Sequence, residues 1–73
     1  MFLVGAMTSR RLATVIRELR EREKLTQEEL ANRAKVARGY LAKLEAGHSK
    51  TPSIATMQRT ARALGVPVTA LLE

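Results

Sequence analysis

The chain has 73 residues, 13 of them Lys or Arg and seven Asp or Glu, which gives a formal net charge of +6. This length supports one small domain whose core hardly encloses a catalytic cleft, so an enzyme is not expected. Without cysteine and with His48 as its one histidine, the chain offers no disulfide or zinc site, and we expect no metal or cofactor. The charge favours an anionic partner, which could be nucleic acid, an acidic protein or a membrane surface, although a solvated basic surface without a partner also fits.

The first eight residues do not match a folded element. The apolar stretch Met1–Met7 is too short to span a membrane and lacks the basic flank of a signal peptide, so we expect a cytoplasmic location. We expect residues 1–8 to form a flexible N-terminal arm, although added sequence before a start at Met7 or an apolar contact with a partner also fits. Residues 9–73 are expected to form the folded domain.

A first helix is predicted from Ser9, which can serve as its N-cap, to near Lys24. Apolar residues recur with the i, i+3, i+4, i+7 spacing of one helix face: Leu12, Val15, Ile16 and Leu19. Arg and Glu residues fill the other face. The pattern predicts an amphipathic helix that packs its apolar stripe against a core.

A second helix is predicted by a capping box, TQEE, at residues 26–29. In such a box the Thr26 hydroxyl accepts a hydrogen bond from the amide of Glu29, whose carboxylate accepts one from the amide of Thr26. The helix is expected to run from Gln27 to about Ala34, where the apolar pattern is interrupted.

A third helix is predicted between Ala37 and Ala46, with Leu41 and Leu44 facing inward and Gly47 ending it. A polar loop is expected over residues 48–52. A fourth helix follows, capped by Ser53 and ended by Gly65, and its expected inward face carries Ile54, Met57, Ala61 and Leu64. A last turn or short helix over Val68–Leu72 closes the core. These elements predict an all-α domain of five helices.

The second and third helices form a candidate helix-turn-helix, because a very short connector joins them. The third helix turns its leucines inward and Arg38 and Lys43 outward, so polar donors project where a DNA groove could lie. Positive charge is concentrated in this part of the chain, where only Glu45 opposes it: Arg33, Lys35, Arg38, Lys43 and Lys50. This arrangement favours nucleic acid among the possible partners.

The stretch Leu12–Leu72 resembles the helix-turn-helix domain of phage repressors and Cro proteins, the XRE family. The resemblance rests on segments at matching separations: LTQEELA at 25–31, Val36, YLAKLEAG at 40–47, Pro52-Ser53 and ALGV at 63–66. It implies a compact five-helix repressor-like fold in which helices 2 and 3 form the helix-turn-helix. It also implies a transcriptional regulator, a repressor, that binds double-stranded DNA sequence-specifically at a palindromic operator.

The resemblance places four residues of the third helix near base edges: Arg38, Gly39, Tyr40 and Lys43. Arg38 is the best candidate reader because its guanidinium can donate two hydrogen bonds to guanine O6 and N7. A phosphate contact is the alternative for Arg38. Gly39 has no side chain to read a base, so it either permits close backbone approach or shifts reading to its neighbours. Tyr40 fits DNA contact and packing at the core edge equally well.

The resemblance also implies phosphate contacts. Gln27 lies at the start of the second helix, where the helix dipole favours a phosphate, although Gln27 could merely support the cap. His48, Ser49 and Lys50 are expected along the phosphate backbone, although a lone histidine is more often simply solvated. Ala37 stands where the family often has a capping hydroxyl, so the third helix is expected to begin without a side-chain cap.

An ion pair between Arg20 and Glu45 is implied by the resemblance. Each residue follows a core leucine, Leu19 and Leu44 respectively, so each flanks the seam where the two helices would meet. A carboxylate in the last turn of a helix opposes the macrodipole, so Glu45 needs compensation. A solvated surface pair is the alternative.

A homodimer is expected on DNA, because one short helix reads only a few base pairs and a symmetric dimer reaches two half-sites about 34 Å apart. The last helix is the expected contact, since little chain remains to cover Leu71 and Leu72. The sequence also fits a protein-interaction module, such as an antitoxin part or an adaptor. Met1–Val4 would then be a further apolar contact surface.

Overall fold

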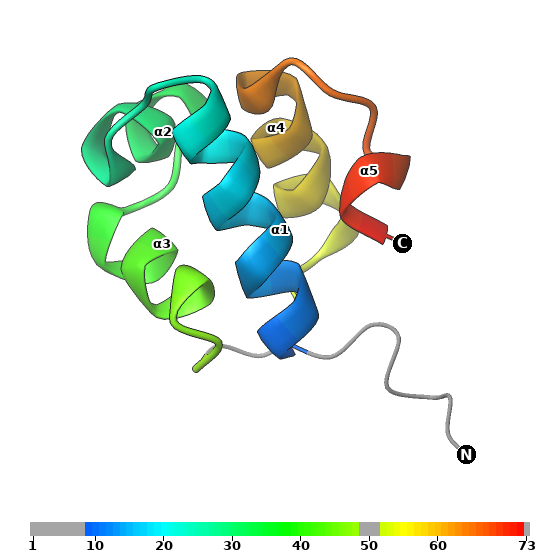
Figure 1. Ribbon diagram of the computed structural model, residues 1–73, viewed down its shortest axis with the longest axis horizontal. Coiled ribbons are helices and arrows are strands. Elements are labelled where there is room, and N and C mark those ends of the chain that lie inside the picture. The colour runs from blue at the N-terminus through cyan, green and yellow to red at the C-terminus, as the bar shows by residue number, and fades with distance from the viewer. Residues whose placement is uncertain (1–8, 49–51, 73) are drawn as a thin grey trace.

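The computed structural model describes residues 9–48 and 52–72. These residues form five α-helices and no strand, which confirms the predicted all-α, five-helix class (Figure 1). The helices are α1 (Ser9–Arg22), α2 (Gln27–Ala34), α3 (Arg38–Glu45), α4 (Ile54–Leu64) and α5 (Thr69–Leu72). Ser9 is the first residue of α1 and not the predicted N-cap, because the helix extends one residue further toward the N-terminus. The predicted arm over residues 1–8 lies outside the described residues.

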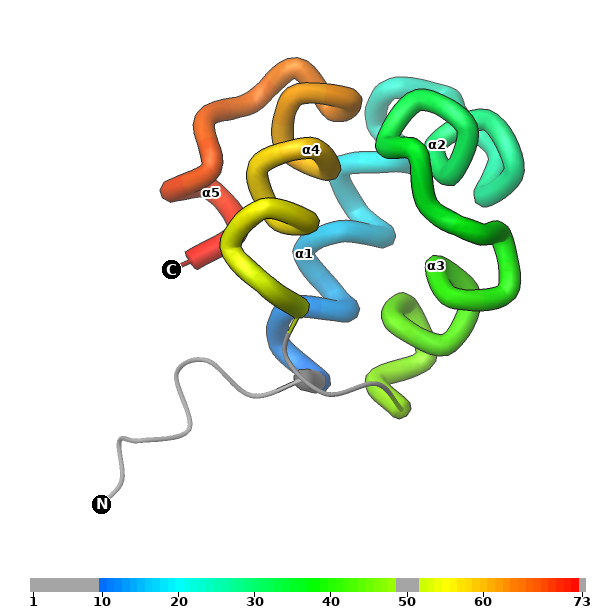
Figure 2. Tube along the Cα trace, turned by 180° about the vertical axis from the view of Figure 1, so that it is seen from behind, coloured from blue at the N-terminus to red at the C-terminus, as the bar shows by residue number. Residues whose placement is uncertain are grey.

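The helices are arranged around α1 (Figures 1 and 2). α1 packs against α3 on one side and α5 on the other, while α2 packs against both α3 and α4. α2 and α3 therefore form one side of the molecule, and α4 and α5 form the other. None of the helices in this part of the chain is long and apolar enough to cross a membrane.

The core is built from one or two leucine-sized side chains of each helix. Those most fully buried are Leu12, Ile16, Leu30, Leu41, Leu44, Leu64 and Leu71. Burying a side chain of this size contributes about 1.5–3 kcal/mol, so these residues supply most of the cohesion of the domain. The inward orientation predicted for Leu41 and Leu44 is confirmed. Val15 and Leu19 are only partly buried and pack against the edge of this cluster.

Two expectations about apolar exposure are wrong. Leu71 is 1% exposed, because the short helix α5 folds back onto α1 and inserts this residue into the core. Ile54 is 57% exposed, although it was assigned to the inward face of α4. It is the first residue of that helix and has no preceding turn to pack beside it.

Four helices end with the same hydrogen-bonded turn, in which a residue with positive φ lies one or two positions after the last helical residue. After α3, the amide of Gly47 donates to the carbonyl of Leu44 at 3.1 Å and the next amide donates to the carbonyl of Lys43 at 3.0 Å. Gly47 has φ +78° and Gly65, after α4, has φ +73°. A glycine that follows a helix predicts this left-handed conformation. Lys24 and Lys35 occupy the equivalent positions after α1 and α2 with φ +58° and +60°.

Candidate nucleic-acid interface

The capping box positions the start of α2. The Thr26 hydroxyl accepts a hydrogen bond from the Glu29 amide at 3.0 Å, and Glu29 Oε1 accepts one from the Thr26 amide at 2.8 Å. Both predicted bonds are therefore present. They leave the amides of Gln27 and Glu28 as unpaired donors at the positive end of the helix dipole. This end of α2 is suited to an anion.

The orientation of α3 is set by what it buries. Leu41, Leu44 and Glu45 are all buried, which turns the opposite face toward solvent. Arg38 and Lys43 are exposed on that outer face, as the sequence predicts. α3 therefore presents a polar, positively charged surface beside the positive end of α2.

Tyr40 lies at the edge of the core. It is partly buried and packs against the apolar cluster, which favours the packing alternative for its ring. Contact between its hydroxyl and DNA remains a prediction.

Gly39 faces open space. A Cβ placed on this residue would meet no atom within 4 Å, apart from its chain neighbours and the backbone of its own helix. Neither packing nor a positive φ therefore requires a glycine here. Both predicted alternatives, close approach of the α3 backbone to a ligand and base reading by the neighbouring residues, stay predictions.

The substitution Gly39→Ala should separate stability from binding. Alanine favours a helix over glycine by about 1 kcal/mol, so the free energy of unfolding should rise by roughly that amount. DNA affinity should fall, because the added methyl group occupies the space that a base or sugar would approach. Urea unfolding and a DNA titration of the same variant test both effects. A gain in stability with unchanged DNA affinity would exclude close approach at this residue.

Arg20 and Glu45, the two residues predicted to pair, are in direct contact. Arg20 Nε donates to Glu45 Oε2 at 2.7 Å, and Arg20 Nη2 donates to Glu45 Oε1 at 3.0 Å. The Glu45 side chain is 3% exposed and that of Arg20 is 14% exposed, so the pair is not the solvated surface contact that was the alternative. The hydrogen bond that Arg20 donates to the Glu45 carboxylate raises the pKa of Arg20. The bidentate pair fastens the end of α3 to α1.

The ion pair extends to the start of α2. Gln27 Nε2 donates to Glu45 Oε1 at 3.2 Å, and Arg20 Nη1 donates to the carbonyl of Leu25 at 2.7 Å. Among the described residues, no buried side-chain nitrogen or oxygen lacks a partner. One carboxylate thus joins three helices at the junction that sets the angle between α2 and α3.

Gln27 has a role that sequence reasoning missed. Its amide nitrogen carries two N–H groups, and the bond to Glu45 uses one of them. The second N–H is available to a phosphate, and Glu45 restricts where it points. The phosphate contact stays a prediction, and the bond to Glu45 shows that Gln27 does more than support the cap. Of the loop residues predicted beside it, His48 is exposed, while Ser49 and Lys50 lie outside the described residues.

The start of α3 lacks a side-chain cap, as predicted. Ala37 has the extended backbone of an N-cap, with φ −71° and ψ 143°, but no side chain that accepts a hydrogen bond from the first turn. Serine at this position should raise the free energy of unfolding by about 1 kcal/mol, because its hydroxyl can accept one of the free amides. Chemical denaturation measures the gain. Ala46→Ser, at the other end of α3, is the control and should give no gain; equal effects would contradict the capping explanation.

Arg59 connects α4 to the end of α2. Its Nε donates to the carbonyl of Ala34 at 3.1 Å, a contact between residues 25 apart in the chain. Sequence reasoning missed it because the bond depends on how the two helices pack.

In the described part of the chain, no group of three or more His, Cys, Asp or Glu side chains could hold a metal ion.

The fold and the geometry of α2 and α3 define a helix-turn-helix domain. The sequence model of the helix-turn-helix family HTH_3 matches residues 16–71. The chain belongs to this family.

Two relatives carry names that bear on function. The immunity repressor protein of Bacillus phage phi105 is 40% identical over 57 residues, which are 78% of this chain and 39% of the repressor. The chain thus spans about two fifths of the length of that repressor. An uncharacterized HTH-type transcriptional regulator of Methanothermobacter thermautotrophicus is 48% identical over 54 residues, covering 74% of this chain and 77% of the regulator.

Solved structures share the fold. The restriction-modification controller protein C.AhdI from Aeromonas hydrophila has a TM-score of 0.82 at 28% identity, covering 86% of this chain and 94% of its own. SinR, a master regulator for biofilm formation crystallised in complex with DNA, has a TM-score of 0.81 at 31% identity. The match covers 85% of this chain and 98% of the SinR chain. The predicted repressor-like domain, with its helix-turn-helix in α2 and α3, is confirmed.

Proposed function

We infer that this chain is a DNA-binding transcriptional regulator that reads the major groove with α3. Family membership, the repressor and regulator among its relatives and the likeness to SinR in its DNA complex support this function. The observation that carries the proposal is the outer face of α3. It exposes Arg38 and Lys43 on a helix whose opposite side is anchored by buried leucines and by Glu45.

The proposal includes the DNA contacts predicted from the sequence. Arg38 donates to the acceptor edge of a guanine, and Lys43 reaches a neighbouring acceptor one turn further along the helix. Gln27 donates its second N–H to a phosphate at the positive end of α2. His48, Ser49 and Lys50 follow the backbone of the DNA strand after α3. Close approach at Gly39 brings the helix deep enough for these contacts.

Selection of bound duplexes from a random pool tests the proposal. One enriched motif is expected, and its affinity should fall steeply with salt, with a log-log slope of about −0.9 for each phosphate neutralised. Absence of enrichment, together with salt-insensitive capture of a protein, would instead favour the interaction-module alternative. DNA is the site of action of such a regulator, so we place the chain in the cytoplasm.

A homodimer on a palindromic operator, acting as a repressor, completes the proposal. Two copies of α3 are needed because one short helix contacts too few base pairs for specificity. With Leu71 buried, Leu72 is the residue of the predicted α5 contact that is exposed. Sedimentation should give two chains for each operator, and Leu72→Ser should weaken assembly. One chain for each operator at saturating concentration would contradict the dimer.

A further inference from the structure

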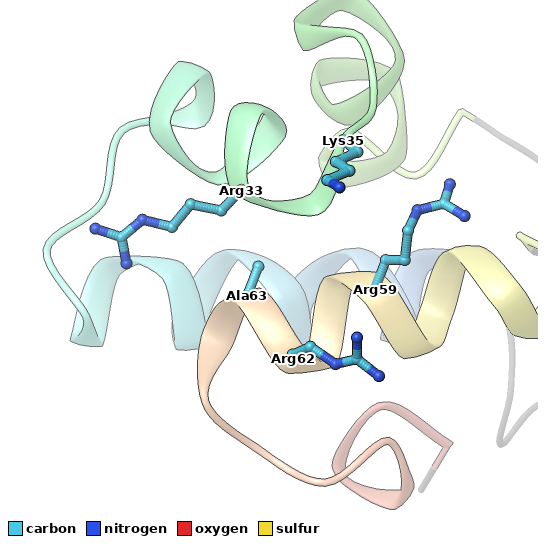
Figure 3. A pocket seen from close by; sticks show the side chains of 5 residues that line it. All are labelled: Arg33, Lys35, Arg59, Arg62 and Ala63. Atoms are coloured by element: carbon cyan, nitrogen blue, oxygen red, sulfur yellow. The ribbon is translucent and has the colours of Figure 1, made fainter.

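A basic hollow lies between the end of α2 and the second half of α4 (Figure 3). It has a volume of about 470 Å³ and is lined by Arg33, Lys35, Arg59, Arg62 and Ala63. Figure 3 shows that Lys35, after α2, and Arg59, on α4, lie on opposite sides of the gap, whereas the side chains of Arg33 and Arg62 start at its edges and extend away from it. Four of the five lining residues are cations and none is a carboxylate.

The helix dipoles account for only part of this cluster. Arg33 and Arg62 lie in the last turns of α2 and α4, where a cation is favourable. The Nε of Arg59 donates a hydrogen bond to the carbonyl of Ala34, so its two terminal nitrogens can still donate to a ligand. Among the described residues, none of the four cations forms an ion pair, so their mutual repulsion is not offset within the protein.

The hollow lies away from the proposed phosphate contacts at Gln27 and in the loop before α4. It lies at the C-terminal end of α2, whereas the proposed phosphate contact lies at its N-terminal end, about 12 Å away along an eight-residue helix. Arg62 lies eight residues after the start of α4, again about 12 Å along the axis from the loop that precedes it. None of the lining residues is a predicted DNA contact, although Arg33 and Lys35 belong to the positive charge that favours nucleic acid.

We propose that this hollow is a binding site for a small anion with at least two phosphoryl groups, distinct from the operator. Arg guanidinium groups match phosphate oxygens in charge and geometry, and four cations balance a diphosphate better than a single carboxylate. The volume is in the range of small-molecule sites, about 300–1,000 Å³. A stable protein interface needs about 800 Å² on each partner, more than a hollow of five residues supplies.

Titration of the full chain with inorganic pyrophosphate at constant ionic strength tests the site. One saturable site is expected for each chain, with a rise in melting temperature as the ligand is added. Arg62→Glu should weaken pyrophosphate binding about tenfold or more, because it replaces a cation by a carboxylate at the ligand. Arg17→Glu is the matched control, since Arg17 is exposed on α1 and gives the same change in net charge outside the hollow. Arg33→Glu is a second variant in case Arg62→Glu does not fold.

Three outcomes would overturn the proposal. Equal losses in Arg62→Glu and Arg17→Glu would show diffuse attraction to the net charge. Equal affinity for citrate would show that phosphoryl groups are not selected. Full competition between pyrophosphate and operator DNA would show that the hollow is part of the DNA surface. The pyrophosphate titration contains no DNA, so its result is independent of whether the proposed regulatory function holds.

Discussion

Replacing Glu45 with alanine should lower the free energy of unfolding by about 3–5 kcal/mol, which removes most of the stability of a domain this small. The loss has two sources. Arg20 would keep its charge with only 14% of its side chain exposed, and Gln27 would lose its acceptor. Truncation leaves partly buried donors unpaired, and this costs more than the intact pair contributes on its own. Thermal or urea unfolding of the variant measures the effect.

Two further variants separate the buried pair from an ordinary surface contact. Glu21→Ala removes the exposed carboxylate that lies 4.0 Å from Arg20 and should cost less than about 1 kcal/mol. Arg20→Met combined with Glu45→Leu should recover much of the loss of Glu45→Ala, because no unpaired charge remains. A double-mutant cycle that gives a coupling below about 0.5 kcal/mol would show that Glu45 contributes little to the junction.

Arg38→Ala should cost roughly 1–3 kcal/mol of binding on the preferred operator and relax discrimination at one or two base positions. The reason is that Arg38 lies on the exposed side of α3, and its guanidinium can supply two parallel donors to one base. Competition titrations against operators changed at single positions measure the loss of discrimination.

A phosphate contact should behave differently from a base contact. Lys50→Ala should weaken binding to all sequences about equally and reduce the salt slope by about one unit. Arg17→Ala, on the exposed face of α1, controls for the change in net charge. If Arg38→Ala gave the same uniform loss as Lys50→Ala, Arg38 would position the protein without specifying the base.

Local rules predicted much of the fold. The capping box of α2, the leucines of α3 and the glycines after α3 and α4 each depend on residues within one or two turns, so their spacing was sufficient. Lys24 and Lys35 were missed because lysine has no preference for positive φ. Their conformation is imposed by the hydrogen bonds that end α1 and α2, in which the following amide donates back to the helix.

Contacts between helices were harder to predict. The burial of Leu71 and the bond from Arg59 to Ala34 depend on how α4 and α5 return to the bundle, which no spacing specifies. The bond from Gln27 to Glu45 follows from the Arg20–Glu45 pair only once the angle between α2 and α3 is known. The outer face of α3 was predictable because the spacing of its leucines identifies the buried face, and the outer face lies opposite to it.

The central claim is that α3 lies in the major groove, and methylation interference on the selected operator tests it most directly. Methyl groups at guanine N7 project into the major groove, whereas those at adenine N3 project into the minor groove. We predict that N7 methylation at the guanines read by Arg38 prevents binding, while N3 methylation at the same half-sites has little effect. Interference confined to adenine N3, or absent at every guanine of the operator, would contradict the account.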